Sequence, residues 1–212
     1  MNTKKYCSLE EGALKALLQS LMKQSRYEHS LNVSERAAFL AEKYGADIEK
    51  ARFAGLVHDI CKGMTGEAQL AIIKEGGISL DPDTIKSPAL WHSIAGSVHI
   101  QKELSVTDED IINAVRYHTT GRAGMTVLEK VVYIADLTGA DRSYPDAGYV
   151  RRLAEISLEQ CIAFSCRWIL ADVTSRGLPA GKDTENLVKE YENVKITYTK
   201  ADFEKGETVN GI

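Results

Sequence analysis

The segment Ala54-Gly55-Leu56-Val57-His58-Asp59 places a histidine and an aspartate directly after an apolar run. An aspartate buried there without a partner would cost several kcal/mol of folding free energy. A cation, a hydrogen-bond network or a metal ion must therefore neutralise the Asp59 carboxylate. Taken alone, the two residues favour a His-Asp pair at the exposed end of a helix, because His-Asp is a common dipeptide, so other parts of the chain must decide between the two interpretations.

Further metal-competent side chains interrupt or end other apolar runs. They are His29, His92, His118 and Asp136. The surrounding runs offer few separate hydrogen-bond partners, whereas one metal centre would satisfy these groups together with the His-Asp pair. Imidazole and carboxylate ligands without thiolate suit iron, manganese, zinc or cobalt. Because this ligand set exceeds what one ion with an open position needs, it favours two ions that share a bridging carboxylate, the arrangement used for phosphoester and phosphoanhydride hydrolysis.

Composition and charge narrow the possible classes. The chain has 212 residues, of which 44% are hydrophobic and 26% charged, so a globular protein is expected and a disordered or collagenous one is excluded. The net charge of −4 argues against a nucleic-acid or anionic-membrane binder but allows a small anion held by local cations. With no long apolar segment, no signal-peptide pattern and no CxxC cysteine pair, we expect a cytoplasmic protein with free thiols.

Apolar spacing with a period near 3.6 residues predicts an all-α protein. Expected helices cover residues 8–23, 26–44, 47–58, 67–75, 87–102, 107–118, 126–140, 149–174 and 184–193. Ser8 with Glu11 and Thr126 with Glu129 form the capping-box pattern, Ser87-Pro88 is typical of a helix start, and Gly45 of a helix end. We expect one domain over residues 1–194, followed by an extension over 195–212 that has weak strand-like alternation at Ile196 and Tyr198.

The order His29, His58-Asp59, Asp136 resembles the HD superfamily of metal-dependent phosphohydrolases, and the interposed His92 and His118 resemble its dinuclear subset. Local strings are similar to the YqeK family of bacterial symmetrical bis(5′-nucleosyl)-tetraphosphatases over residues 14–193. The strings are Arg26-Tyr27-Glu28-His29-Ser30, His58-Asp59-Ile60-Cys61-Lys62, Trp91-His92-Ser93, Tyr117-His118-Thr119-Thr120-Gly121 and Ile134-Ala135-Asp136.

This resemblance implies an HD-domain helical bundle with a dinuclear, iron-containing site that cuts diadenosine tetraphosphate into two ADP. Manganese, cobalt or zinc would also fit the ligand chemistry. The implied metal ligands are His29, His58, Asp59, His92, His118 and Asp136. In the reaction a metal-bridging hydroxide would attack phosphorus, with Asp59 bridging the ions and Lys62 holding a phosphate oxygen. His99, the remaining histidine, is expected to be ordinary background.

The resemblance also implies which residues contact the nucleotide. They are Arg26, the segment Asp59, Ile60, Cys61 and Lys62, then Thr119 and Arg142, together with the metal ligands His29, His92, His118 and Asp136. A less typical C-terminal stretch adds Asp183, Thr184 and Asn186. A tetraphosphate carries about four negative charges, so it requires such local cations. Plainer interpretations stay open, since Lys62 could simply stabilise a helix C-terminus and Arg142 could form a surface ion pair with Asp141.

Alternative functions share the same motifs. The chain could be another HD phosphohydrolase that acts on nucleoside mono- or triphosphates or on cyclic dinucleotides, although no Gly-Tyr-Pro motif follows the His-Asp pair. It could also be a non-catalytic sensor of metal and nucleotide, or a di-iron oxygenase with a neutral substrate. The expected partner is a nucleotide that yields products such as ADP or GDP, not a nucleic acid or a membrane, and the chain could be a monomer or a homodimer.

Overall fold

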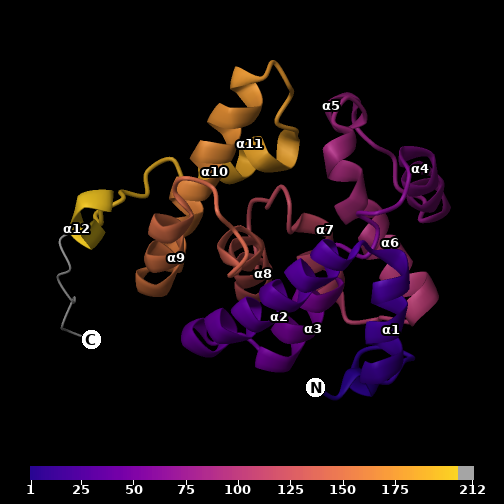
Figure 1. Ribbon diagram of the computed structural model, residues 1–212. Coiled ribbons are helices and arrows are strands. Elements are labelled where there is room, and N and C mark those ends of the chain that lie inside the picture. Colours follow the sequence, from indigo (N-terminus) through magenta and orange to yellow (C-terminus); the bar gives the residue numbers. More distant parts are fainter. Residues whose placement is uncertain (205–212) are drawn as a thin grey trace.

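The structure is a computed structural model that describes residues 1–204, and all regular elements in that range are helices (Figure 1). The prediction of an all-α protein is confirmed. The elements are η1 (Thr3–Lys5), α1 (Glu11–Leu21), α2 (Gln24–Tyr44), α3 (Ile48–Val57), α4 (Gly66–Glu75), α5 (Pro82–Ile85), η2 (Pro88–Leu90), α6 (Trp91–Leu104), α7 (Glu109–Tyr117), α8 (Val127–Thr138), α9 (Ala147–Ile156), α10 (Leu158–Ser175), α11 (Lys182–Glu190) and α12 (Lys200–Glu204).

The core forms where α2, α3, α7 and α8 pack against one another. Helix α8 is the most buried of these elements, because Val131, Val132 and Ile134 are fully enclosed on different sides of it. In Figure 1, α4 and α6 lie to the right of this centre, α10 and α11 above it, and α9 and α12 to the left. The packing therefore brings the ends of several helices to one place beside α8.

Two of the predicted helix boundaries are confirmed, and each has the capping interaction predicted for it. Gly45 ends α2 in the left-handed conformation, with a φ of 76° that favours glycine. Thr126 and Glu129 open α8 with a reciprocal capping box. Glu129 is only 1% exposed and also accepts two hydrogen bonds from the Arg122 guanidinium, at 2.6 and 2.8 Å. The start of α8 is thus fixed by a buried, fully bonded carboxylate.

The predicted capping box at the first helix is wrong. Helix α1 begins at Glu11 itself, and the Ser8 backbone N–H donates to the Leu104 carbonyl instead. The Glu11 carboxylate binds the N-terminal ammonium of Met1 at 2.8 Å and Lys15 at 2.6 Å. A carboxylate held by these two cations is no longer free to cap the helix.

Two other predicted boundaries also differ. The Ser87 hydroxyl donates to the Pro179 carbonyl at 3.3 Å, so Pro88 begins the short η2 and α6 starts only at Trp91. The single helix predicted over residues 149–174 is two helices. Ser157 has an extended backbone and its hydroxyl accepts from the Gln160 N–H, so it caps α10 and separates it from α9. Serine stabilises such breaks because its hydroxyl competes for backbone donors.

Residues 195–199 pack against the rest of the protein in an irregular course rather than as a strand, and the short helix α12 follows them. Ile196 and Tyr198 are partly buried against the core, and the Tyr149 hydroxyl donates to the Tyr198 carbonyl at 2.8 Å. Lys200 forms an ion pair with Asp146 at 2.5 Å. The rest of the predicted extension, residues 205–212, lies outside the described range.

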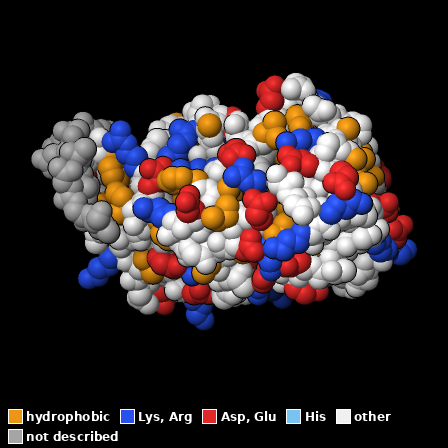
Figure 2. All heavy atoms as spheres, turned by 90° about the horizontal axis from the view of Figure 1, so that it is seen from below, with side chains coloured by type: hydrophobic (Ala, Val, Ile, Leu, Met, Phe, Trp, Pro, Cys, Tyr) orange, Lys and Arg blue, Asp and Glu red, His pale blue; other side chains and the backbone are white. Residues whose placement is uncertain are grey.

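One face of the molecule mixes both signs of charge. On the face drawn in Figure 2, Lys and Arg side chains alternate with Asp and Glu side chains over the described atoms. This face therefore does not provide the basic field that nucleic acids require. Across residues 1–204, no helix combines the length and the apolar character needed to span a bilayer.

Candidate metal centre and adjoining cavity

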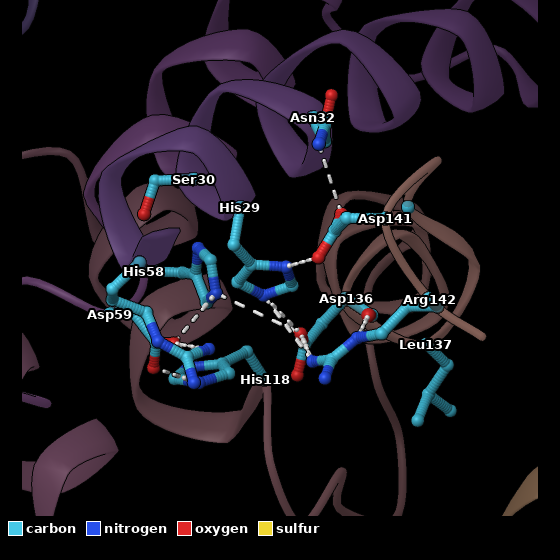
Figure 3. Close-up of polar contacts among 12 residues, drawn as sticks. His29, Ser30, Asn32, His58, Asp59, His118, Asp136, Leu137, Asp141 and Arg142 are labelled. Atoms are coloured by element: carbon cyan, nitrogen blue, oxygen red, sulfur yellow. Dashed lines mark hydrogen bonds and ion pairs between the residues drawn. The ribbon is translucent and has the colours of Figure 1, made fainter. Parts of the chain in front are cut away.

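The predicted ligands converge from five helices on one point beside α8. His29 comes from α2, His58 and Asp59 from the end of α3, His92 from the first turn of α6, His118 from the end of α7, and Asp136 from within α8. Figure 3 shows His29, His58, Asp59, His118 and Asp136 pointing toward one another. The fold thus brings together every residue that the sequence predicted as a metal ligand.

Asp59 lies at the centre of this cluster. Its Oδ1 is 3.2 Å from His92 Nε2 and 3.5 Å from His118 Nε2, while its Oδ2 is 3.4 Å from His58 Nε2. On the other side of the cluster, His29 Nε2 lies 2.9 Å from Asp136 Oδ1. The two carboxylate oxygens of Asp59 therefore face different histidines, as a bridging ligand requires.

Because the cluster is buried, its polar atoms lower the stability of the fold unless a cation binds them. His29, His58, Asp59, His92 and His118 are each at most 3% exposed. Among the described residues, His58 Nε2 and Asp59 Oδ1 have no hydrogen-bond partner. A buried polar atom left without a partner costs about 1–3 kcal/mol. Both atoms point into the cluster, where a metal ion would satisfy them.

The donor set fits a divalent metal ion. Three groups of residues place ligand atoms within 4.8 Å of one another, and His58, Asp59 and His118 each belong to two of the groups. The groups are His29, His58 and Asp59, then His58, His118 and Asp136, and then Asp59, His92 and His118. Imidazole nitrogens and carboxylate oxygens are ligands for the first-row divalent metals.

Backbone carbonyls set the orientation of three of the imidazoles. The Nδ1 atoms of His58, His92 and His118 lie 2.7, 2.8 and 2.7 Å from the carbonyl oxygens three residues earlier in the chain. A carbonyl only accepts hydrogen bonds, so each Nδ1 must carry the proton. Each Nε2 is then left bare and faces the centre, which is the state that a metal ligand needs.

Asp141 orients the fourth imidazole, a role that the sequence did not reveal. Its Oδ2 accepts from His29 Nδ1 at 2.7 Å, and its Oδ1 accepts from the Asn32 side chain at 3.1 Å. Carboxylates that hold a histidine ligand in this way fix its tautomer and strengthen its basicity. Asp141 is 112 residues from His29 in the chain, so no local pattern could have identified the pair.

Electrostatics keep the ligands in the protonation states that bind metal. Burial lowers the pKa of His92 to about 4, against the opposing pull of Asp59. Burial alone would raise the pKa of Asp59, but the adjoining imidazoles of His58, His118 and His92 hold it well below its usual range. The pKa of Asp136 is lowered in the same way, since His29 outweighs the effect of burial. A neutral imidazole and ionised carboxylates bind metal without first losing a proton.

Three cations surround the cluster, as predicted. Arg26 Nη1 lies 2.9 Å from Asp59 Oδ2, and the Lys62 amine lies 3.2 Å from His92 Nε2. Arg142 pairs with the Asp136 carboxylate, and its Nε donates to the Asp136 carbonyl at 2.7 Å. Arg142 therefore faces the cluster.

The other residues predicted to contact nucleotide divide into two groups. The Thr119 hydroxyl lies beside the cluster, 3.2 Å from His92 Nε2. The side chains of Ile60 and Cys61 are fully enclosed in the core, and burial raises the pKa of the Cys61 thiol to about 12. Both residues are 0% exposed, backbone included, so neither of them is open to a ligand.

A cavity of about 300 Å³ opens beside the cluster. His118, Thr119 and Asp136 line one end of it. Its walls are mostly apolar and come from η2 and from α10 with the segment that follows; they include Leu90, Ile169, Val173, Leu178 and Pro179. A cavity of this size with an apolar lining and a few polar groups is typical of a small-molecule site.

The predicted C-terminal contacts lie at and beyond the edge of this cavity. Thr184 is buried, lines the cavity and donates to the Thr120 carbonyl at 3.2 Å. Asp183 and Asn186 are exposed on α11 and do not line it. The apolar wall from α10 was not predicted, because its residues resemble ordinary core positions in the sequence.

Comparison with known proteins places this cluster in a family context. The HD domain model matches residues 26–141, a range that contains every predicted metal ligand and Asp141. A symmetrical bis(5′-nucleosyl)-tetraphosphatase of Bacillus subtilis is 40% identical over 177 residues, which cover 82% of this chain and 92% of that protein. A protein of the same name from Halalkalibacterium halodurans is 31% identical, over 83% of this chain and 94% of that protein.

A solved structure shares the fold. A predicted HD superfamily hydrolase involved in NAD metabolism from Clostridium acetobutylicum superposes with a TM-score of 0.85 at 33% sequence identity. The match covers 88% of this chain and 99% of that protein. The helical arrangement that assembles the cluster is therefore one that a solved relative also adopts.

Proposed function

The chain belongs to the HD domain family, and on this premise we propose that it hydrolyses dinucleoside tetraphosphates symmetrically, so that diadenosine tetraphosphate and water give two ADP. Its similarity to the symmetrical tetraphosphatases of Bacillus subtilis and Halalkalibacterium halodurans, over more than nine-tenths of those proteins, supports this substrate. The observation that carries the proposal is the buried cluster of histidine and aspartate side chains. Within it, His58 Nε2 and Asp59 Oδ1 have no hydrogen-bond partner and lie among other potential metal ligands.

The metal would be held by the residues that already converge. His29, His58 and Asp59 would bind one divalent ion with help from Asp136, and His92 and His118 would bind a second that shares Asp59. When bound, such ions lower the pKa of a coordinated water and neutralise phosphate oxygens. We propose iron as the metal, and manganese, cobalt and zinc remain compatible with the same ligands.

The surrounding cations supply the charge that a tetraphosphate requires. Arg26, Lys62 and Arg142 reach the cluster from three different segments, and each lies within hydrogen-bond distance of a ligand side chain. Bound phosphates could take over these contacts, because guanidinium and ammonium groups bind phosphate oxygens through charge-assisted hydrogen bonds. We propose that Lys62 and Asp59 act directly on the reacting phosphate, Lys62 by holding an oxygen of it.

One nucleoside would lie in the apolar cavity. The cavity begins at His118 and Thr119, so a phosphate at the cluster leaves its nucleoside against the wall from α10. The hydroxyls of Thr184 and Thr119 would bond its polar atoms. Ile60 and Cys61 are fully enclosed and would support the cluster from the core rather than contact the nucleotide. Asp183 and Asn186 do not line the cavity and would act only beyond its edge.

Activity on a panel of nucleotides tests this function. Protein purified anaerobically should contain about two metal ions per chain and should release ADP as the sole nucleotide product from diadenosine tetraphosphate. Nucleoside monophosphates, nucleoside triphosphates and cyclic dinucleotides should be turned over far more slowly. Release of ATP and AMP, or preferential turnover of a mononucleotide, would contradict the proposal.

Nucleotide bound without turnover by metal-loaded protein would point instead to a sensor. All six predicted metal ligands are present in the cluster, which supports an enzyme rather than a sensor. A nucleotide substrate is consistent with our proposal that the protein acts in the cytoplasm. Size-exclusion chromatography with light scattering would decide between a monomer and a homodimer.

A further inference from the structure

A second cavity, of about 530 Å³, lies on another side of the cluster. The end of α1, the connection to α2 and the first turn of α2 form one wall, through Ser20, Lys23 and Ser25 among others. Lys62 and Gly63 form the opposite wall. Gly63 is required here, because a Cβ atom at this position would lie 2.9 Å from the Leu21 carbonyl oxygen. The two walls can therefore approach this closely only because residue 63 has no side chain.

The metal cluster lies between this cavity and the apolar one. Arg26 and Lys62 line the second cavity, and they reach Asp59 at 2.9 Å and His92 at 3.2 Å. Thr119 lines the apolar cavity and lies 3.2 Å from the same Nε2 atom of His92. One residue from the lining of each cavity, Lys62 and Thr119, thus approaches the same atom of the cluster, His92 Nε2.

The two cavities differ in their chemistry. The apolar cavity can enclose a base, whereas the second cavity presents Arg26, Lys62 and Lys23 together with the hydroxyls of Ser20 and Ser25. Cationic side chains with small polar neighbours bind a diphosphate mainly through its charge. Each cavity has the volume range of a small-molecule site.

We propose that the second cavity binds the other nucleoside diphosphate half of the substrate. This inference rests on the proposed function, because symmetrical cleavage places the reacting phosphates at the cluster and leaves one ADP on each side of it. Arg26 and Lys62 hold the phosphates of this second half, and its nucleoside lies against the wall that contains Ser20 and Ser25. The apolar cavity selects the base of one half, and the second cavity recognises the other half chiefly by charge.

Filling the second cavity with a large side chain tests this arrangement. Ser25→Trp places an indole in the cavity, and Gln24→Trp is the matched control because Gln24 is the adjacent exposed residue and does not line it. The two substrates are diadenosine tetraphosphate and adenosine 5′-tetraphosphate, which lacks the second nucleoside. We expect Ser25→Trp to raise KM for the dinucleotide by about tenfold and to leave KM for adenosine tetraphosphate unchanged. Gln24→Trp should alter neither.

Equilibrium dialysis with ADP provides a readout that does not depend on turnover. Wild-type protein should bind two ADP per chain at saturation, and Ser25→Trp should bind one. Ser20→Trp fills the same cavity from the end of α1 and replaces Ser25→Trp if that variant fails to fold.

Each contrary result has a distinct meaning. The second site would be overturned by any of three results. These are unchanged kinetics in both cavity variants, an equal rise in KM for both substrates, or binding of only one ADP per chain by the wild type. Failure of the wild type to release ADP from diadenosine tetraphosphate would instead overturn the proposed function, whatever the variants do.

Discussion

Asp141 holds the His29 imidazole through a 2.7 Å hydrogen bond to Nδ1, and this contact directs His29 Nε2 toward Asp136. The carboxylate comes from the loop after α8, whereas the histidine comes from α2. Arg151 fixes that loop from α9, since its guanidinium donates to the Gly139 carbonyl at 2.9 Å and also to the Arg142 carbonyl. The geometry of one metal ligand therefore depends on a residue outside the cluster.

Removal of this carboxylate should weaken metal binding. We expect Asp141→Ala to lower metal affinity about 10- to 100-fold, because carboxylates that orient a histidine ligand have effects of this size. A competitive chelator titration measures the change. Asn32→Ala removes only a hydrogen bond to the other oxygen of Asp141 and should give a smaller loss. Equal metal affinity in Asp141→Ala and wild type would show that the contact does not orient His29.

The buried carboxylate at the start of α8 should matter for stability. Glu129→Ala removes the capping box and leaves Arg122 without its partner, so we expect a loss of about 2–4 kcal/mol in the free energy of unfolding. Urea denaturation measures this loss. Glu155→Ala is the matched control, because the Glu155 side chain is 46% exposed in its pair with Arg36 and should contribute at most about 1 kcal/mol. A similar effect of the two substitutions would contradict the role of burial.

The cysteines should be inert in the folded protein. Burial raises the pKa of the Cys61 and Cys161 thiols to about 12 and that of Cys166 to about 11, and it also raises the pKa of Cys7. The thiolate form reacts, so at pH 8 a thiol with a pKa near 12 is ionised in only about one molecule in ten thousand. A colorimetric thiol reagent should therefore label the chain at pH 8 only in denaturant, where all four cysteines react. Rapid labelling of native protein would show that a thiol is accessible.

The metal ligands could be predicted from the sequence because each of them interrupts an apolar run. A polar group such as Asp136, within residues 131–137, must find a partner, and several such groups in one small protein indicate a shared centre. Thr126 and Glu129 were predictable for a similar reason, since a capping box involves neighbours in the chain.

Features that depend on distant segments could not be predicted. Asp141 looks like half of a surface pair with Arg142, and only the packing of α2 against the loop after α8 reveals its contact with His29. Ser8 has the pattern of a helix cap, but Glu11 is taken by the N-terminal ammonium. Both cavities are likewise built from segments far apart in the chain.

The most direct test of the central claim is the amount of ADP released from diadenosine tetraphosphate by metal-loaded wild type and by Asp59→Asn. Asp59 lies between His58, His92 and His118, so its loss removes the shared ligand of the cluster. The wild type should release two ADP per substrate, and Asp59→Asn should be slower by about a thousandfold while it retains its helical fold and loses metal. ADP release by Asp59→Asn at the wild-type rate would contradict the account.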